Sequence, residues 1–243
     1  MNAASLCALL LAYLLGCVPS AWLAGKWVKG IDIRRHGSGN MGATNVFRVL
    51  GPGPGVAVLL ADIAKGALAV LLIPRLIPLG DAPWTDTPWV GYGLGALWWP
   101  CFLGLAAVLG HTYTVFLGFK GGKGVATSLG VFLALAPWAT LAAVAVFGGV
   151  FWVTRMVSAG SLAAAAFLPG AVALFNEWRP WTGHPPDFFN ALSLLGQDSW
   201  RTKPVLCLAL VLSLLVWLKH LPNIRRILAG TENRILTGKG RGA

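Results

Sequence analysis

The stretch from Gly110 to Thr127, GHTYTVFLGFKGGKGVAT, carries two lysines and a histidine among glycines, between two apolar runs. Glycine lets a ligand approach the backbone closely, and successive exposed N–H groups form a concave nest that binds anions. With the added charge of Lys120 and Lys123, the stretch predicts a site for phosphate or another oxyanion. The alternative is a glycine-rich turn whose lysines face anionic lipid headgroups. The glycines expected at the site are Gly121, Gly122 and Gly124.

This loop does not have the spacing of a nucleotide-binding P-loop. Leu117 stands where the first glycine of that motif belongs, and Gly124 replaces the Ser or Thr that binds magnesium. The sequence therefore argues against an ATPase. We interpret His111 as a donor that holds the loop, with a ligand contact by His111 as the alternative.

A second glycine-rich stretch, HGSGNMGATN at residues 36–45 with an arginine soon after it, lies in a predicted loop over residues 28–54. Its glycines match GxGxxG, but no strand precedes them and no βαβ unit surrounds them, so a dinucleotide site is not supported. The polar side chains suit a cradle for phosphate oxygens or glycerol hydroxyls, and the alternative is a turn with capping residues. The candidates are Ser38, Asn40, Gly42, Thr44, Asn45 and Arg48.

Lys65 stands inside an apolar run, with Asp62 three positions before it. An ionisable group in a membrane span is costly, so it is usually paired or functional. The spacing puts both side chains on one face of a helix. We expect a paired lysine at a binding site, and a lysine that snorkels to the interface is the alternative.

Polar groups recur near the start of a helix predicted from residue 157 and in the C-terminal tail. Ser158 and Ser161 lie in the first turns of that helix, where serines bond the backbone, a neighbouring helix or a ligand. His220 is the best candidate for a general base because its intrinsic pKa suits proton transfer near neutrality. Asn223 and Glu232 accompany it, and the alternative for this tail is lipid binding by its basic residues.

The composition places these groups in a membrane protein. The chain of 243 residues is 56% hydrophobic and only 11% charged, whereas soluble domains carry about 25% charged residues. The net charge is +11, but the placement of the basic residues follows membrane topology, so we predict no nucleic-acid partner. The four cysteines lie in apolar runs and form no CxxC pair, which argues against zinc and a disulfide framework.

We predict an all-α, polytopic membrane protein with seven transmembrane helices in a single domain over residues 1–243. The expected helices cover about residues 3–27 (bent at Pro19), 55–77, 89–109, 157–175 and 204–218, plus two short helices within 125–153 that Pro137 divides. A proline-rich turn is expected at 74–88, and the polar loop 176–203 is open to a surface helix. The N-terminus then lies outside and the C-terminus in the cytoplasm, because most of the 19 basic residues fall inside. This topology brings the three polar stretches to one face.

Three motifs, taken together, resemble the bacterial acyl-phosphate:glycerol-3-phosphate acyltransferase family. They are SGNMGATN at 38–45 with Arg48, GH at 110–111 through FKGGKGVAT at 119–127, and HxxNIxR at 220–226 with GTE at 230–232. The resemblance covers nearly the whole chain, including the order of the motifs. Met41 stands where proline is usual, which would loosen the first loop, and Asn233-Arg234 stand where a lysine is common, which weakens a role for Arg234.

The resemblance implies an enzyme that moves a fatty acyl group from an acyl phosphate to the 1-hydroxyl of sn-glycerol 3-phosphate, giving lysophosphatidic acid and inorganic phosphate. It implies no acyl-CoA, metal or cofactor, and an active site on the cytoplasmic side of the bacterial inner membrane; we also expect a monomer among membrane lipids. The catalytic residues would be Ser38, Lys123, His220 and Asn223. The substrates would be held by Asn40, Gly42, Thr44, Asn45, Arg48, Lys65, His111, Lys120, Gly121, Gly122, Gly124, Ser158, Ser161 and Glu232.

In the expected reaction the glycerol hydroxyl attacks the acyl carbonyl, while loop N–H groups and Lys123 stabilise the oxyanion and the leaving phosphate. The proton goes to His220 or to a substrate phosphate oxygen; the second route is favoured because no His–acid pair is visible in the sequence. A membrane transporter for an organic phosphate or another anion is the alternative class, although the predicted outer loops offer few polar groups. The HxxxxD signature of other acyltransferases is absent.

Overall fold

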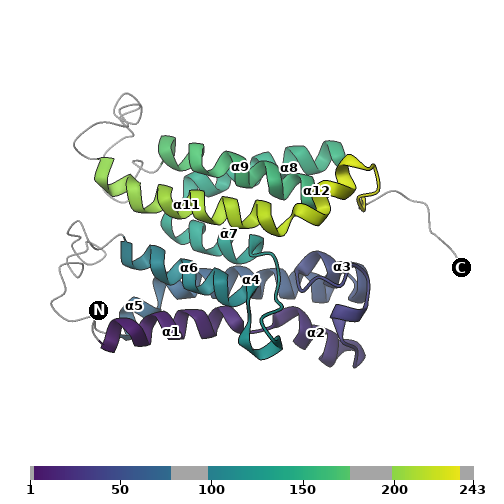
Figure 1. Cartoon of the computed structure of the whole chain (residues 1–243), viewed down its shortest axis with the longest axis horizontal. Helices are drawn as coiled ribbons and strands as arrows, with labels where there is room; N and C mark the ends of the chain where they lie inside the picture. Colours follow the sequence, from purple (N-terminus) through teal and green to yellow (C-terminus); the bar gives the residue numbers. More distant parts are fainter. Residues whose placement is uncertain (1–2, 78–97, 176–198, 236–243) are drawn as a thin grey trace, which may run out of the picture.

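A computed structural model describes residues 3–77, 98–175 and 199–235, and every regular element in these ranges is helical, as predicted. The helices run side by side along the long axis of the molecule (Figure 1). In chain order they are α1 (Ala3–Cys17), α2 (Ser20–Lys29), α3 (Ala43–Leu50), α4 (Pro52–Leu71), α5 (Ile73–Leu76), α6 (Trp98–Thr112), α7 (Val125–Leu135), α8 (Pro137–Thr154), α9 (Val157–Phe175), α11 (Ser199–Lys219) and α12 (Leu221–Leu228), with 3-10 turns η1 (Ile33–Arg35) and η2 (Val115–Leu117).

Five stretches are long and apolar enough to cross a membrane: Ala3–Lys29, Pro52–Leu71, Trp98–Leu117, Pro137–Thr154 and Val157–Phe175. A sixth is added if Lys203–Lys219 and Leu221–Leu228, which meet at a bend of 57°, count as one span. Helix α7 is apolar but shorter, at 11 residues. It covers about 16 Å of a hydrocarbon core about 30 Å thick. The described chain is therefore an integral membrane bundle with five or six candidate spans.

Prolines divide the helices where the sequence predicts. Pro19 separates α1 from α2, and Pro137 begins α8 directly after α7. Proline has no N–H to donate and disfavours helical backbone in the residue before it. Accordingly, Ala136 has φ −146° and ψ 67°. The predicted division of residues 125–153 into two helices is confirmed, and so are the bounds of the helix at 157–175.

Two helices were not predicted. The loop expected over residues 28–54 contains α3, and the tail begins with α12. Both are short and strongly amphipathic, so neither stands out as a membrane span. Three expectations lie wholly or partly outside the described residues. They are the part of the turn at 74–88 that follows residue 77, the start of the helix predicted from residue 89, and most of the loop 176–203 with its possible surface helix.

The bundle has two sides joined by α7. Helices α1 to α6 lie on one side, α8, α9, α11 and α12 lie on the other, and α7 runs between them (Figure 1). Glycines permit close helix crossings at this join: a Cβ on Gly66 would lie 2.1 Å from the carbonyl oxygen of Thr127, and one on Gly130 would lie 1.9 Å from that of Ile63. Small residues let membrane helices approach this closely. Helix α4 is thereby held against α7.

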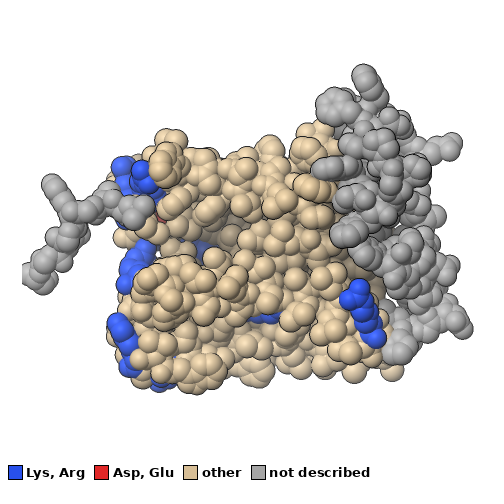
Figure 2. All heavy atoms as spheres, turned by 180° about the vertical axis from the view of Figure 1, so that it is seen from behind, with Lys and Arg blue, Asp and Glu red and all other residues tan. Residues whose placement is uncertain are grey.

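Basic side chains gather at one end of the bundle, the end that carries α2, α3 and α12 (Figures 1 and 2). Over most of the length seen in Figure 2 only small areas of Lys or Arg show, and this face is hollowed between the two sides of the bundle near the basic end. The three polar stretches of the sequence belong to that end.

The α4–α7 crossing can be tested at Gly130. We expect Gly130→Ala to destabilise the protein by about 1–3 kcal/mol because the added methyl forces the two helices apart. Gly148→Ala is the matched control, since nothing lies within 4 Å of a Cβ at Gly148 in α8, and it should leave stability unchanged or raise it slightly. Unfolding temperatures in detergent measure both effects, and equal temperatures for the two variants would contradict the packing described.

Candidate active site

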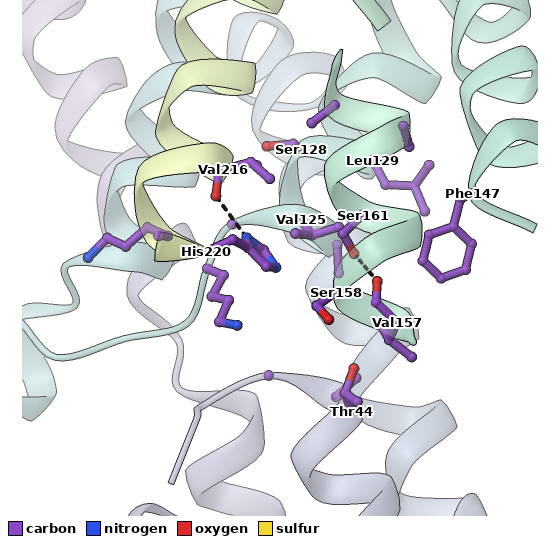
Figure 3. Close-up of a pocket in the computed structure, with 18 of the residues that line it drawn as sticks. Thr44, Val125, Ser128, Leu129, Phe147, Val157, Ser158, Ser161, Val216 and His220 are labelled. Carbon is purple, nitrogen blue, oxygen red and sulfur yellow. Dashed lines mark hydrogen bonds between the residues drawn. The ribbon is translucent and has the colours of Figure 1, made fainter. Parts of the chain in front are cut away.

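A cavity of about 550 Å³ lies at the basic end and continues between the helices. Its polar end is formed by the first loop and α3, the glycine-lysine loop, the start of α9, and α12 with the chain after it. Figure 3 shows Thr44 facing Ser158 across this space, with His220 to one side. Segments more than 150 residues apart in the sequence therefore share one chamber.

Most of the predicted site residues line this cavity. Those that do are Ser38, Asn40, Gly42, Thr44, Asn45, Arg48, His111, Lys123, Gly124, Ser158, Ser161, His220, Asn223 and Glu232. The predicted residues that do not line it are Lys65, Lys120, Gly121 and Gly122.

The carboxylate of Glu232 joins three of the converging segments. Its Oε1 accepts hydrogen bonds from Ser158 Oγ (2.7 Å) and Asn223 Nδ2 (2.6 Å). Its Oε2 accepts one from Arg226 Nε at 2.7 Å. Asn223 in turn accepts a hydrogen bond from Lys123 Nζ through Oδ1. One carboxylate thus fixes the amide of Asn223 so that its oxygen faces the lysine of the glycine loop.

This arrangement shifts the pKa values of both charged groups at its ends. Burial lowers the pKa of Lys123 to about 8, with Glu232 raising it and Arg226 lowering it. Burial raises the pKa of Glu232, but hydrogen bonds from Ser158, Asn223 and Arg226 outweigh this, so its pKa lies below the ordinary value. At neutral pH the site therefore holds an ionised carboxylate between two cations.

The N-terminus of α7 adds N–H donors beside Lys123. Gly124 precedes the helix with φ 82°, and no side chain caps it. The first N–H groups of a helix have no acceptor within the helix, and they bind anions together with the helix dipole. Val125 and Ala126, in the first turn, line the cavity. This end of the cavity can therefore hold a phosphate against backbone donors and an ammonium group.

His220 sits at the bend between α11 and α12 and is buried. Its Nδ1 lies 2.7 Å from the carbonyl oxygen of Val216 (Figure 3). A carbonyl only accepts, so Nδ1 carries the proton, and in the neutral ring Nε2 is an acceptor. His220 can accept a proton or a substrate hydrogen bond through Nε2.

Asn45 was predicted to contact substrate, but its amide holds the first loop together. The side chain is 1% exposed. Its Oδ1 accepts from the backbone N–H of Ser38 (2.8 Å), and its Nδ2 donates to the carbonyls of Ile33 (3.3 Å) and His36 (3.0 Å). Both amide donors are used, so Asn45 positions Ser38 and the glycines around it.

Lys65 belongs to a second polar cluster, beside the cavity. Its ammonium group lies 2.8 Å from Asp62 Oδ1 and donates to the carbonyl of Val18 at 3.1 Å. That carbonyl is available because the helix breaks at Pro19. Ser20 Oγ donates to the same Asp62 oxygen at 2.5 Å. The predicted Asp62–Lys65 pair is confirmed, but Lys65 stabilises the junction of α1, α2 and α4 and does not line the cavity.

His111 connects this cluster to the glycine loop. Its Nδ1 lies 3.6 Å from Asp62 Oδ1. Its backbone carbonyl accepts a hydrogen bond from Gly122 N at 3.0 Å, and a Cβ on Gly122 would lie 2.2 Å from Nε2 of the ring. Gly121 and Gly122 therefore shape the loop around the histidine, and Lys120 points outward, exposed. The holding role of His111 fits this geometry.

Several polar residues of the site were not predicted. The Asp62–His111 pair joins residues far apart in the sequence. A search of the sequence for a histidine close to an acidic residue therefore does not find it. Arg226 was given no role at the site, and lipid binding was the alternative for the basic tail that contains it. It lies one turn after Asn223 on α12 and pairs with Glu232. The amphipathic pattern of residues 221–228 was the available signal. Ser128 and Asn233 also line the cavity, and neither has a motif of its own.

The Asp62–Lys65 pair generates a stability prediction. Asp62→Asn leaves the Lys65 ammonium buried without its counter-charge and should cost about 3–5 kcal/mol. The double variant Asp62→Asn with Lys65→Met should recover part of the loss, because methionine needs no counter-charge. Unfolding temperatures measured in detergent compare the variants. If Asp62→Asn alone is as stable as the parent, the Asp62–Lys65 pair does not stabilise the junction of α1, α2 and α4.

Comparison with known proteins agrees with this geometry. A sequence model of the family described as Glycerol-3-phosphate acyltransferase matches residues 6–230. A relative of that name from Geobacter sulfurreducens is 44% identical over 223 residues, covering 92% of this chain and 93% of the relative. One from Halalkalibacterium halodurans is 39% identical over 225 residues, covering 92% of each.

Solved structures agree as well. The structure is similar to two crystal structures of PlsY (YgiH), an integral membrane glycerol 3-phosphate acyltransferase. The glycerol 3-phosphate form matches with a TM-score of 0.73 and 36% sequence identity. The lysophosphatidic acid form matches with a TM-score of 0.71 and 35% sequence identity. Each match covers 96% of both chains. The resemblance of the three sequence motifs is confirmed, and this chain belongs to the glycerol-3-phosphate acyltransferase family.

Proposed function

We propose that this protein transfers a fatty acyl group from an acyl phosphate to the 1-hydroxyl of sn-glycerol 3-phosphate, releasing inorganic phosphate and lysophosphatidic acid. The observation that carries the proposal is one cavity with two phosphate-binding features at its polar end and apolar walls beyond them. The glycine loop, Lys123 and the α7 N-terminus form one feature. The first loop with Thr44 and Arg48 forms the other. The crystallised relatives in glycerol 3-phosphate and lysophosphatidic acid forms support this assignment.

In the reaction the glycerol oxygen forms a bond to the acyl carbon, and the bond from that carbon to the phosphate oxygen breaks. Lys123 and the α7 N–H groups stabilise the negative charge that develops on the carbonyl oxygen and the leaving phosphate. In the proposed reaction these groups and Arg48 supply the positive charge, and neither a metal nor acyl-CoA takes part.

The hydroxyl proton goes to a phosphate oxygen of the substrates or to Nε2 of His220. We favour the phosphate, because the partner of His220 Nδ1 is the carbonyl of Val216 and not a carboxylate. A carbonyl stabilises the imidazolium less than an ionised acid does. In this proposal His220 orients substrate through Nε2.

Purified protein in detergent with acyl phosphate and glycerol 3-phosphate tests the function. We expect release of phosphate with stoichiometric lysophosphatidic acid, and Lys123→Ala should lose about 100-fold or more in turnover, as for other lost oxyanion donors. His220→Ala should lose only a few-fold in turnover; a loss of several orders of magnitude would assign the proton to His220. Lys26→Ala, on the exposed part of α2, is the control. Uptake of glycerol 3-phosphate by liposomes without acyl donor would favour a transporter instead.

The pKa of Lys123 predicts how kcat/KM changes on the alkaline side of the pH profile. A lysine binds phosphate when charged, and with a pKa of about 8 it loses its charge as the pH rises through that value. We therefore expect kcat/KM to fall above about pH 8, by up to tenfold per unit. In Lys123→Arg the guanidinium stays charged, so any residual activity should lack this fall once spontaneous hydrolysis of the donor is subtracted.

We further propose that α7 completes a seven-helix arrangement in a bacterial inner membrane, with the N-terminus outside and the site and C-terminus in the cytoplasm. The gathering of basic residues at the cavity end supports this orientation (Figure 2). In a cysteine-free background, a membrane-impermeant maleimide should label Arg75→Cys in right-side-out vesicles and Lys29→Cys only in inverted ones. The reverse pattern would overturn the orientation.

A further inference from the structure

Beyond its polar end, the cavity continues as an apolar arm between α7, α8, α9 and α11. Residues that line this arm include Leu129, Phe132, Ala143, Phe147, Leu168 and Leu212. In the view of Figure 3, Leu129 and Phe147 lie beyond Ser161 as seen from His220. In the proposed function this arm receives the hydrocarbon chain of the acyl donor.

The far end of the arm is closed by packed side chains. Thr140 is the lining residue of α8 nearest the turn between α7 and α8, and it is 2% exposed. Phe132 of α7 and Leu212 of α11, which also line the arm, are each 1% exposed. Phe132 and Leu212 belong to the main buried cluster, which continues into Ala136 at the turn. A chain that reaches Thr140 therefore meets core and not lipid.

The helices give the depth of the arm. Val157, at the start of α9, lies at the polar end, and Leu168 lines the arm further along the same helix. At about 1.5 Å per residue these positions are about 17 Å apart. An extended chain with C–C bonds of about 1.5 Å advances about 1.3 Å per carbon. Counted from the polar end to Leu168, the cavity thus accommodates about 13 carbons.

We propose that Thr140, supported by Phe132, sets the upper limit of acyl-chain length that this protein accepts, which rests on the function proposed above. Thr140 lines the arm, and its Oγ1 donates a hydrogen bond to the carbonyl of Ala136 at 2.8 Å. The hydroxyl therefore presents no free donor to the chain. Discrimination is steric: an added methylene would have to displace side chains of a close-packed core.

Graded variants on α8 test this inference. Thr140→Phe should shorten the longest chain accepted by about 2 to 4 carbons, and Ala143→Phe, one turn nearer the polar end, should shorten it by about 3 to 4 more. Ala143 lines the cavity and is 6% exposed. The ratio of kcat/KM between chains just above and just below the new limit should fall about 10-fold or more.

Two controls separate length selection from general damage. Leu141→Phe adds an aromatic ring at the neighbouring position, which is 51% exposed and does not line the cavity, and it should keep the parental profile. Thr140→Val keeps the shape and removes the hydroxyl, and it should also keep the profile. A loss of folding or chemistry lowers kcat/KM for all chains alike, so the ratio within one protein is unaffected by it.

The measurement is kcat/KM for acyl phosphates from about 8 to about 18 carbons with each variant. If the parent protein forms no lysophosphatidic acid with any of them, the proposed function is wrong. If the parent is active but Thr140→Phe and Ala143→Phe retain its length profile, the function stands and the role of Thr140 is refuted. A graded shift in the order Thr140→Phe, then Ala143→Phe, supports the role.

Discussion

The polar end of the cavity depends on the carboxylate of Glu232. Its two oxygens accept from Ser158, Asn223 and Arg226, and through Asn223 they orient the hydrogen bond to Lys123. Cations gathered without a counter-charge would repel one another and lose their geometry. One acid among several bases keeps the cluster positive while fixing its shape. Negative substrates can then bind to groups that need no rearrangement, which is what electrostatic preorganisation requires.

A second carboxylate, Asp62, does comparable work where the chain is irregular. The break at Pro19 leaves the carbonyl of Val18 outside a helix, and Lys65 binds both that carbonyl and Asp62. Irregular backbone is tolerated in a membrane only where protein groups satisfy it. The same carboxylate faces His111, around which the glycine loop is shaped. The loop that presents Lys123 is thus supported from the bundle interior as well as from the tail.

The sequence predicted the all-helical membrane bundle and its breaks because apolar stretches and proline position each have one dominant cause. The division at Pro137 and the convergence of three polar stretches at one end follow from these rules. The short helices α3 and α12 escaped prediction because each is only eight residues long and strongly amphipathic, without the apolar length that marks a span. Asn45 and Lys65 were assigned to substrate because residue type shows that a polar group needs a partner, but only the fold shows that the partner is the protein itself.

The two ends of the cavity are built from different physical interactions, and this allows them to vary separately. The polar end is fixed by hydrogen bonds that converge on Glu232 and Asn45, so substitutions there disturb charge and chemistry. The apolar arm is bounded by dispersion contacts around the α7–α8 turn at Ala136, where a change of side-chain volume alters shape alone. Helix α7 links them, because its first turn lines the polar end of the cavity and its last turn carries Phe132, which lines the apolar arm. Gly66 and Gly130 hold α7 against α4, so this packing fixes where both ends of the cavity lie relative to the rest of the bundle.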